Sequence, residues 1–146
     1  MSNLMKDVKV TVVEAAGGAA QTELVTDILD MSGYEGVMFL ALLGDVTSGS
    51  VLTLTAKGNS ANSVSTPTPV AQGNATFTAG ATDADSKLLM VDVYKPPLRY
   101  MFGSLTRTTQ DAIVGGIIAI QYGAHNKPTT QDASVIASTF ALGVAS

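Results

Sequence analysis

Few side chains in this 146-residue sequence are of types and spacings that could do chemistry. His125 is the single histidine and cysteine is absent, so a metal centre or a thiol nucleophile would lack partners. Asp83 and Asp85 are spaced like two ligands of a calcium loop, but the glycine and the closing glutamate of an EF-hand are missing. A solvated turn is the better interpretation of this pair, and we expect no metal site.

Gly115 and Gly116 are the next candidates, because glycine-rich loops can cradle phosphates. The pair is not part of a Walker or Gly-x-Gly-x-x-Gly pattern, and no predicted helix follows it. It favours a bulge or close packing across a sheet instead. A Gly-x-Ser-x-Gly nucleophile elbow is also missing. The sequence therefore predicts no catalytic residue and no cofactor, and an architectural role rather than an enzyme.

The densest group of polar and aromatic side chains brackets the double proline at 96–97. This group is Asp92, Tyr94, Lys95, Arg99 and Tyr100. One interpretation is a structural corner that satisfies its own backbone. The other is a contact surface, because tyrosine and arginine are enriched where proteins bind each other. Tyr94, Lys95, Arg99 and Tyr100 are therefore candidate interface residues.

The element expected at the centre of the fold is residues 112–122, which read Ala-Ile-Val-Gly-Gly-Ile-Ile-Ala-Ile-Gln-Tyr. β-branched residues occupy both alternating registers, which predicts a strand that is covered on both faces. A helix is disfavoured, because two glycines in its interior would cost about 2 kcal/mol relative to alanine. The remaining elements must supply the neighbours and the cover of this strand.

Further strands are expected where apolar or alternating runs end at turn residues. The complete set of expected strands is 8–13, 24–30, 37–43, 51–57, 76–78, 88–94, 99–106 and 112–122, with the longest loop at 58–69. The run 37–43 is apolar on both registers, and 76–78 would be a weak edge strand. No helix is predicted. Eight short strands predict an all-β fold, a single-domain antiparallel β-sandwich of jelly-roll type over residues 1–131.

The segment after the central strand changes in character. Residues 132–146 are too apolar for a disordered end. We expect an extended C-terminal arm that packs either on its own domain or on a neighbouring subunit. Its candidate interface residues are Val135, Ile136, Phe140 and Leu142.

The chain is poor in charge. Charged residues make up 14% of it, against roughly 25% in average soluble domains, and 46% of the residues are hydrophobic. A surface of this kind is usually covered in part by another subunit or partner. The net charge is −4 and the eight Lys and Arg are scattered singly, which argues against direct nucleic-acid binding.

Neither export nor membrane insertion is predicted. No apolar run approaches the roughly 20 residues that a membrane span requires. Charges at Lys6, Asp7 and Lys9 interrupt the region where a secretory signal would need its apolar core. We expect a protein that is made and retained in the cytoplasm.

Three stretches together resemble a family of small structural proteins from the heads of tailed bacteriophages. They are Asp-Val-Tyr-Lys-Pro-Pro-Leu-Arg-Tyr at 92–100, the segment 112–128, and Asp-Met-Ser-Gly-Tyr-Glu-Gly-Val at 30–37, where an aromatic-Glu-Gly turn precedes an apolar strand. The resemblance spans about residues 8–134, apart from the loop 58–69. Some members resemble capsid decoration or cement proteins, which implies a jelly-roll domain that binds outside the shell as a dimer or trimer.

The resemblance implies a structural virion protein at the capsid surface, assembled in the host cytoplasm, which cements the shell by bridging subunits of the major capsid protein. A tail or head-completion subunit is an alternative, and it would form a closed ring of fixed, larger number. A carbohydrate-binding sandwich module is the alternative from another class. Against it stand the absence of tryptophan and the presence of only four Tyr and four Phe.

Overall fold

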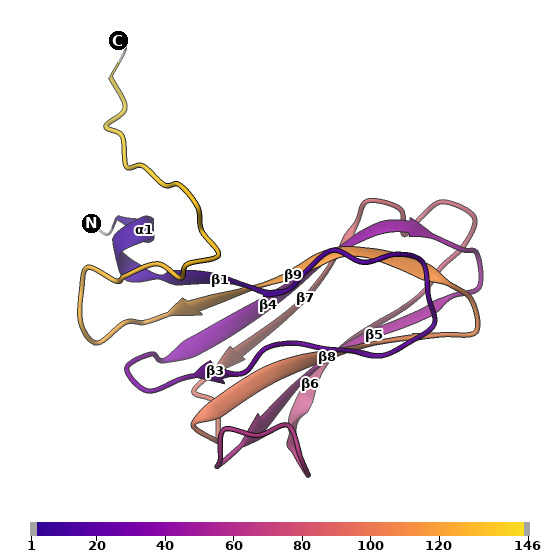
Figure 1. The fold of residues 1–146 in the computed structure, drawn as a ribbon, viewed down its shortest axis with the longest axis horizontal. Coiled ribbons are helices and arrows are strands. Elements are labelled where there is room, and N and C mark those ends of the chain that lie inside the picture. Colours follow the sequence, from indigo (N-terminus) through magenta and orange to yellow (C-terminus); the bar gives the residue numbers. More distant parts are fainter. Residues whose placement is uncertain (1–2, 145–146) are drawn as a thin grey trace.

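A computed structural model describes residues 3–144 as two antiparallel sheets packed face to face (Figure 1). The elements are α1 (Leu4–Asp7), β1 (Lys9–Glu14), β2 (Leu24–Val25), β3 (Leu29–Asp30), β4 (Gly36–Val46), β5 (Val51–Asn59), β6 (Thr68–Thr78), β7 (Leu88–Tyr94), β8 (Tyr100–Thr108) and β9 (Ala112–Tyr122). Sheet A has the strand order β1-β9-β4-β7. Sheet B has the order β2-β8-β5-β6, and β3 also pairs with β8. The predicted all-β antiparallel sandwich is confirmed.

The connections between the strands give this sandwich the topology of a jelly roll. The chain passes to the other sheet at every connection after β1, apart from the short step from β2 to β3 and the hairpin from β5 to β6. As a result, strands that are distant in sequence, such as β1 and β9, are neighbours in sheet A. A four-stranded and a five-stranded sheet connected in this way are the jelly-roll arrangement.

The core lies between the sheets, because the strands point alternate apolar side chains inward. In β5, Leu52, Leu54 and Ala56 are fully buried, as the alternating pattern predicts. Phe39 and Ala41 of β4 meet them from sheet A within the same cluster. The strand β9 lies between β1 and β4, which makes it an inner strand, as expected.

The two glycines of β9 interrupt the regular alternation of inward-facing and outward-facing side chains along this strand. Leu42 pairs with Gly116 and Leu43 pairs with Val114, so Gly115 is an extra residue that forms a bulge. Val114 and Ile117 both point inward as a result, although their separation by three residues would place them on opposite faces of a regular strand. The φ angle of Gly116 is +137°, a conformation that favours glycine.

Three expectations about the elements are wrong. The single strand expected at 24–30 is divided into β2 and β3, because the Gly103 N–H donates to the Thr26 hydroxyl instead of to a backbone oxygen and so ends the ladder. The edge strand expected at 76–78 starts at Thr68, so the polar loop before it is shorter. Pro69 is tolerated there because β6 is an edge strand. Finally, α1 forms one helical turn before β1.

Among residues 3–144, Arg107 is the one cation that lies buried inside the fold. Its side chain is on β8 and the residue is only 3% exposed. The guanidinium donates to the carbonyl oxygens of Thr22 (Nε, 2.9 Å), Ala112 (Nη1, 2.8 Å) and Gly18 (Nη1, 3.3 Å), and to the Thr22 hydroxyl (Nη2, 2.9 Å). None of the ion pairs found among residues 3–144 includes it. Arg107 therefore fastens the loop between β1 and β2 to the turn between β8 and β9.

Candidate functional site

The side chains with possible chemistry are engaged in turns or stand alone. The Asp83 carboxylate accepts the Gly80 N–H at 2.6 Å, and the Asp85 carboxylate accepts the Val46 N–H at 2.8 Å. His125 is exposed. Among residues 3–144, no three His, Asp or Glu side chains gather as a metal site would require. In the same range there is no helix long and apolar enough to cross a membrane.

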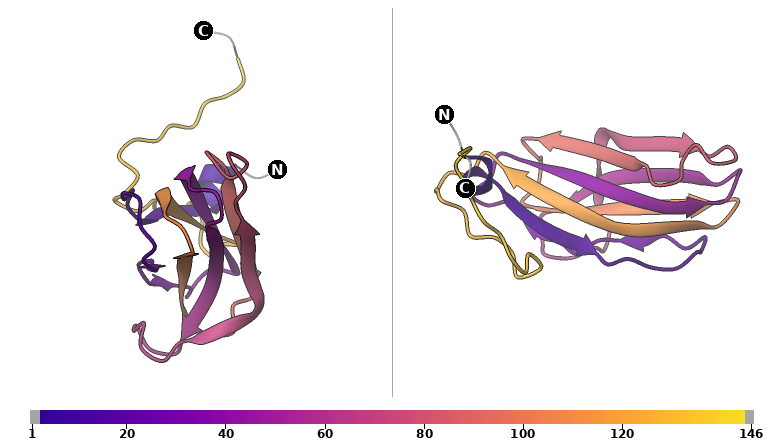
Figure 2. Two further views of the ribbon diagram at one scale, coloured as in Figure 1. Left: turned by 90° about the vertical axis from the view of Figure 1, so that its right-hand side faces the viewer. Right: turned by 90° about the horizontal axis from the view of Figure 1, so that it is seen from above.

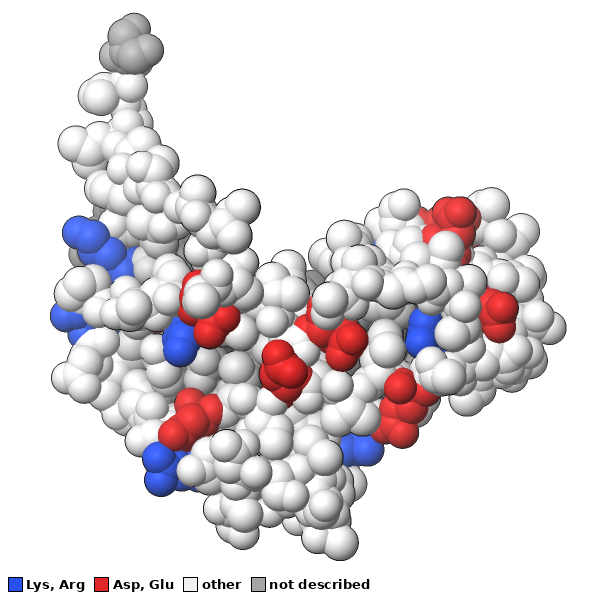
Figure 3. All heavy atoms as spheres, viewed as in Figure 1, with Lys and Arg blue, Asp and Glu red and all other residues white. Residues whose placement is uncertain are grey.

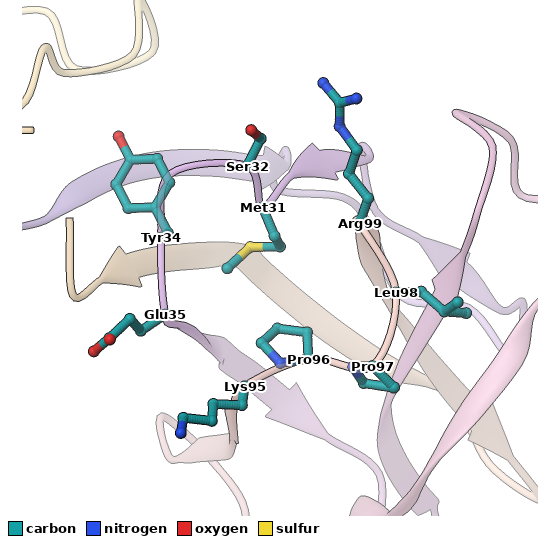
Figure 4. A pocket seen from close by; sticks show the side chains of 9 residues that line it. All are labelled: Met31, Ser32, Tyr34, Glu35, Lys95, Pro96, Pro97, Leu98 and Arg99. Atoms are coloured by element: carbon teal, nitrogen blue, oxygen red, sulfur yellow. The ribbon is translucent and has the colours of Figure 1, made fainter. Parts of the chain in front are cut away.

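The double proline forms a corner, residues 94–100, that faces the turn between β3 and β4. The two segments line a shallow groove of about 430 Å³ (Figure 4). The groove residues are Met31, Ser32, Tyr34, Glu35, Lys95, Pro96, Pro97, Leu98 and Arg99. Backbone bonds join its walls, from the Lys95 N–H to the Glu35 oxygen at 2.7 Å and from the Met31 N–H to the Arg99 oxygen at 2.8 Å. The corner is thus a fixed shape.

The charged and aromatic side chains of the corner bond to one another and stay accessible. Arg99 binds both oxygens of Asp30, with Nε and Nη2 each at 2.9 Å, and lies over the Tyr100 ring at 5.2 Å. Lys95 lies over the Tyr94 ring at 5.4 Å, and Tyr94 is 61% exposed. The corner therefore satisfies its own polar groups, as the first interpretation predicts. Its exposed side chains are also still available for contact with a partner.

The ion pair between Arg99 and Asp30 predicts a lowered pKa for the Asp30 carboxyl group. Hydrogen bonds from Arg99 and then from the Ser32 N–H hold the pKa of Asp30 below its ordinary value. The stabilisation is present above the unfolded-state pKa and is lost as the pH falls through the lower folded-state pKa. Arg99→Gln should raise the pKa of Asp30, measured from the NMR chemical shift of its carboxyl carbon. A titration curve that is the same in both proteins would contradict the predicted role of Arg99.

Beside the corner, Tyr122 of β9 lies across Gly36 of β4 and reaches Asp92 of β7. Its hydroxyl donates to the Asp92 carboxylate at 2.5 Å. Burial, and then this carboxylate, raise the pKa of Tyr122. A Cβ atom at Gly36 would overlap the Tyr122 ring, so the glycine of the aromatic-Glu-Gly turn makes room for the aromatic side chain. The resulting row of side chains ends at the exposed Tyr94, which pairs with Gly36.

Residues 129–134 form a clamp on the free edge of β1. Gln131 donates through Nε2 to the oxygens of Met5 (2.9 Å) and Val8 (2.8 Å), and its Oε1 accepts the Val10 N–H (2.8 Å). The Ser134 hydroxyl accepts the Val12 N–H at 2.9 Å. Side chains thus satisfy an edge that would otherwise be open to another strand.

Removing the central residue of the clamp should loosen that edge. Gln131→Ala leaves the Val10 N–H without its partner and takes one donor from the Met5 and Val8 oxygens, which keep the Thr129 hydroxyl. We therefore expect a loss of about 1 kcal/mol in the free energy of unfolding. Amide hydrogen exchange at Val10 should accelerate, which separates a local effect from a global one. Thr130→Ala is the matched control, because its side chain is exposed. Equal exchange in the two variants would count against the clamp.

Beyond the clamp, the C-terminal arm leaves the body of the protein. Val135 lines an apolar groove of about 370 Å³ together with residues of α1 and β1, and Lys6 lies 5.7 Å from the centre of the Phe140 ring. Ile136 is 97% and Leu142 73% exposed. These four candidate interface residues stay predictions, as does the expected division between residues 131 and 132.

A candidate surface that the sequence did not predict is the outer face of sheet A, which we call the aliphatic face. One row of pairs crosses all four strands and is made of Val12, Ile118, Leu40 and Met90. The neighbouring row is Val10, Ile120, Met38 and Asp92, and Leu42 and Leu88 lie beyond the first row. Only Asp92 is charged in these rows. The most open of the aliphatic side chains are 37% to 55% exposed, so a continuous apolar surface faces solvent.

The outer face of sheet B has the opposite character. Thr106, Thr53 and Thr76 form one row, and Ser104, Thr55 and Asn74 form the next, in which Ser104 is buried and donates to the Glu23 carboxylate. The hydroxyls of Thr53 and Thr76 lie 3.1 Å apart and bond to each other. Sheet B thus has the hydroxyl-rich outer face that is usual for a solvated antiparallel sheet, and sheet A does not. The signal for the aliphatic face was present in 37–43 and 112–122, which are apolar on both registers.

The fold and these surfaces define a jelly-roll sandwich. Among solved structures it is similar to the PBSX exported protein XepA, with a TM-score of 0.54 and 17% identity. The match covers 99% of this chain and 46% of XepA. A structure of infectious bursal disease virus, Gt strain, matches with a TM-score of 0.48 and 11% identity over 83% of this chain and 33% of the viral one.

At these identities the similarity shows the fold alone. The chain spans less than half the length of either protein. No family model matches the sequence, and no curated protein matches it either. The expected membership of a phage decoration family therefore stays a prediction.

Proposed function

We propose that this chain is a structural protein of a tailed-bacteriophage virion that decorates the capsid and cements it by bridging subunits of the major capsid protein. The corner at 94–100 carries the proposal, because it holds exposed tyrosine and arginine side chains on a fixed backbone, as protein interfaces do. Charged side chains are scattered singly or in small groups over a mostly uncharged surface (Figure 3). The similarity of fold to a phage exported protein is compatible with this function.

The corner is the surface that we assign to the shell. It lies at the end of the sandwich where β7 stops and β8 begins, and it presents Tyr94, Lys95 and Arg99 on a fixed backbone. Exposed aromatic and cationic groups on a rigid loop contribute strongly to protein interfaces. Burial of apolar surface contributes about 25 cal/mol per Å², so a small contact repeated over many capsid sites would stabilise a shell strongly.

A sugar-binding function has less support. Sugar-binding sites on jelly rolls need exposed aromatic rings that stand together. Among residues 3–144, the exposed aromatic side chains are Tyr94, Phe77 and Phe140. They belong to the end of β7, to the edge strand β6 and to the arm, which are separate parts of the fold.

Co-sedimentation with capsid shells assembled without this protein tests the proposal. We expect saturable binding at a fixed ratio to the capsid subunits. The double variant Tyr94→Ser, Lys95→Ser should bind at least tenfold more weakly, while Thr55→Ser on the outer face of sheet B should bind normally. Binding that does not saturate, or none at all, would overturn the proposal, and a closed ring in solution without shell binding would favour a tail or head-completion subunit.

A further inference from the structure

The structure suggests what covers the aliphatic face. We propose that this face binds residues 135–144, the part of the C-terminal arm that follows the clamp, of a second copy of this chain, and that two copies exchange these segments reciprocally; from here on the arm means residues 135–144. The inference concerns association in solution and goes beyond the proposed function, because it holds for an assembly protein of any kind.

The arm has the pattern of a strand with one large and one small face. From Ile136 onward, the large apolar residues share the even positions, Ile136, Phe140, Leu142 and Val144, with Ser138 between them. The odd positions hold small residues, Ala137, Thr139, Ala141 and Gly143. In an extended chain alternate side chains point to opposite sides. An extended arm can therefore place Ile136, Phe140, Leu142 and Val144 on one surface.

The aliphatic face matches the arm in chemistry and in size. Residues 135–144 contain no charged side chain, and the two rows across sheet A contain only Asp92. The ten residues of the arm span about 33 Å when extended, and the eleven-residue strand β9 spans about 36 Å. One arm can thus follow the whole length of the face.

The position of the arm favours a second copy over the arm's own sandwich. The clamp fastens the base of the arm beside Val12 on β1, the outermost strand of sheet A. From there the arm rises on the side toward which the aliphatic face is turned, and it points away from its own sheet (Figures 1 and 2). The right panel of Figure 2 shows the four strands of sheet A side by side, with the arm beyond one end. When two copies face each other across a two-fold axis, each arm starts at the margin of the partner's face.

The area is sufficient for a stable pair. Five side chains of the aliphatic face are exposed by 37% to 55%, and its other four apolar side chains are half-buried. Together they offer on the order of 500 Å² per copy, which is at the upper end for patches on ordinary monomers. Two such faces and the exposed side chains of two arms reach the roughly 1,200–2,000 Å² of a specific interface.

The oligomeric state in solution is the first test, measured by analytical ultracentrifugation of the full chain at micromolar concentration. We expect a dimer. Removal of residues 135–146, which leaves the clamp in place, should give monomers, and so should Leu40→Glu on the aliphatic face. Thr55→Glu on the outer face of sheet B is the matched control and should stay dimeric. A monomeric full chain, or a dimer that survives the removal of the arm, would overturn the proposal.

Crosslinking identifies the occupant of the face, because the natural sequence contains no cysteine. One copy carries Met90→Cys and the other carries Leu142→Cys, each with a different tag. When the two are mixed and oxidised, a disulfide should join the two differently tagged chains. A chain with both substitutions that forms only an internal disulfide at high dilution would show that the arm folds onto its own face, against the proposal. Neither test uses capsids, so a dimer that does not bind shells would refute only the proposed function.

Discussion

Replacing Arg107 with methionine should lower the free energy of unfolding by about 3 kcal/mol. Methionine fills a similar volume but removes the guanidinium donors from the Thr22 oxygens and from the Ala112 oxygen, which keeps only the longer bond from the Ala20 N–H at 3.3 Å. Hydrogen bonds from charged donors contribute more than neutral ones, and buried acceptors that lose their donor keep their desolvation cost. The loop between β1 and β2 loses its attachment at the same time. Urea unfolding at neutral pH measures the difference.

Arg99→Met is the matched control for this prediction. Arg99 has a carboxylate partner, Asp30, and it is exposed. Ion pairs at the surface contribute little, because water screens the charges and the free side chains are well solvated. We therefore expect a much smaller change than at Arg107, even though Arg99 makes the only bidentate ion pair among the described residues. Similar losses in the two variants would show that burial is not what makes Arg107 important.

Gly116→Ala should cost about 2–3 kcal/mol, because a side chain at φ +137° strains the backbone. An added Cβ would also lie 3.3 Å from the Glu14 oxygen on β1. The bulge can relax only by a change in register between β9 and its neighbours, which would turn inward-facing side chains outward. Thermal unfolding should show a lower midpoint for this variant.

Gly115→Ala provides the comparison within the same pair of glycines. The nearest atoms to a Cβ at this position lie 3.4 to 3.5 Å away and belong to Leu42, which is ordinary contact. Its φ is outside the range that favours glycine, so alanine should be tolerated within about 0.5 kcal/mol. If both substitutions had equal effects, the cause would be the loss of a flexible residue and not the conformation of the bulge.

Most of the fold could be predicted from local pattern. The alternation of Leu52, Leu54 and Ala56 correctly identified the inner face of β5, and the isoleucines correctly identified β9 as an inner strand. The long edge strand β6 could not be predicted, because its Thr, Asn, Gly and Pro residues are those of a loop. Both halves of β6 pair with β5, and this pairing keeps β6 extended. The residue types of β6 do not predict the pairing.

The candidate surfaces were predicted less well, since they depend on which strands become neighbours. The corner was found because its unusual residues are adjacent in sequence. The aliphatic face is made of side chains from four strands that are far apart in the chain, such as Val12 and Met90. The two-sided apolar pattern predicted that β9 would be covered on both faces, but the described chain covers only one, and Ile118 stays open. If another molecule buries this face, the only sign of it in the sequence is the excess of apolar residues in strands such as β9.

The pairing of β1 with β9 has a consequence for how the chain folds. Sheet A cannot be completed until residue 122 has left the ribosome, because β9 separates β1 from β4. Until then β1 has no strand partner and β4 lacks one of its two. Val12 of β1 and Leu40 of β4 both pair with Ile118, which lies 106 and 78 residues later in the chain. Folds dominated by such distant pairings form slowly. The nascent chain therefore exposes apolar strands during its synthesis. We expect the yield of folded protein to depend strongly on temperature and on chaperones, even where the folded sandwich itself is stable.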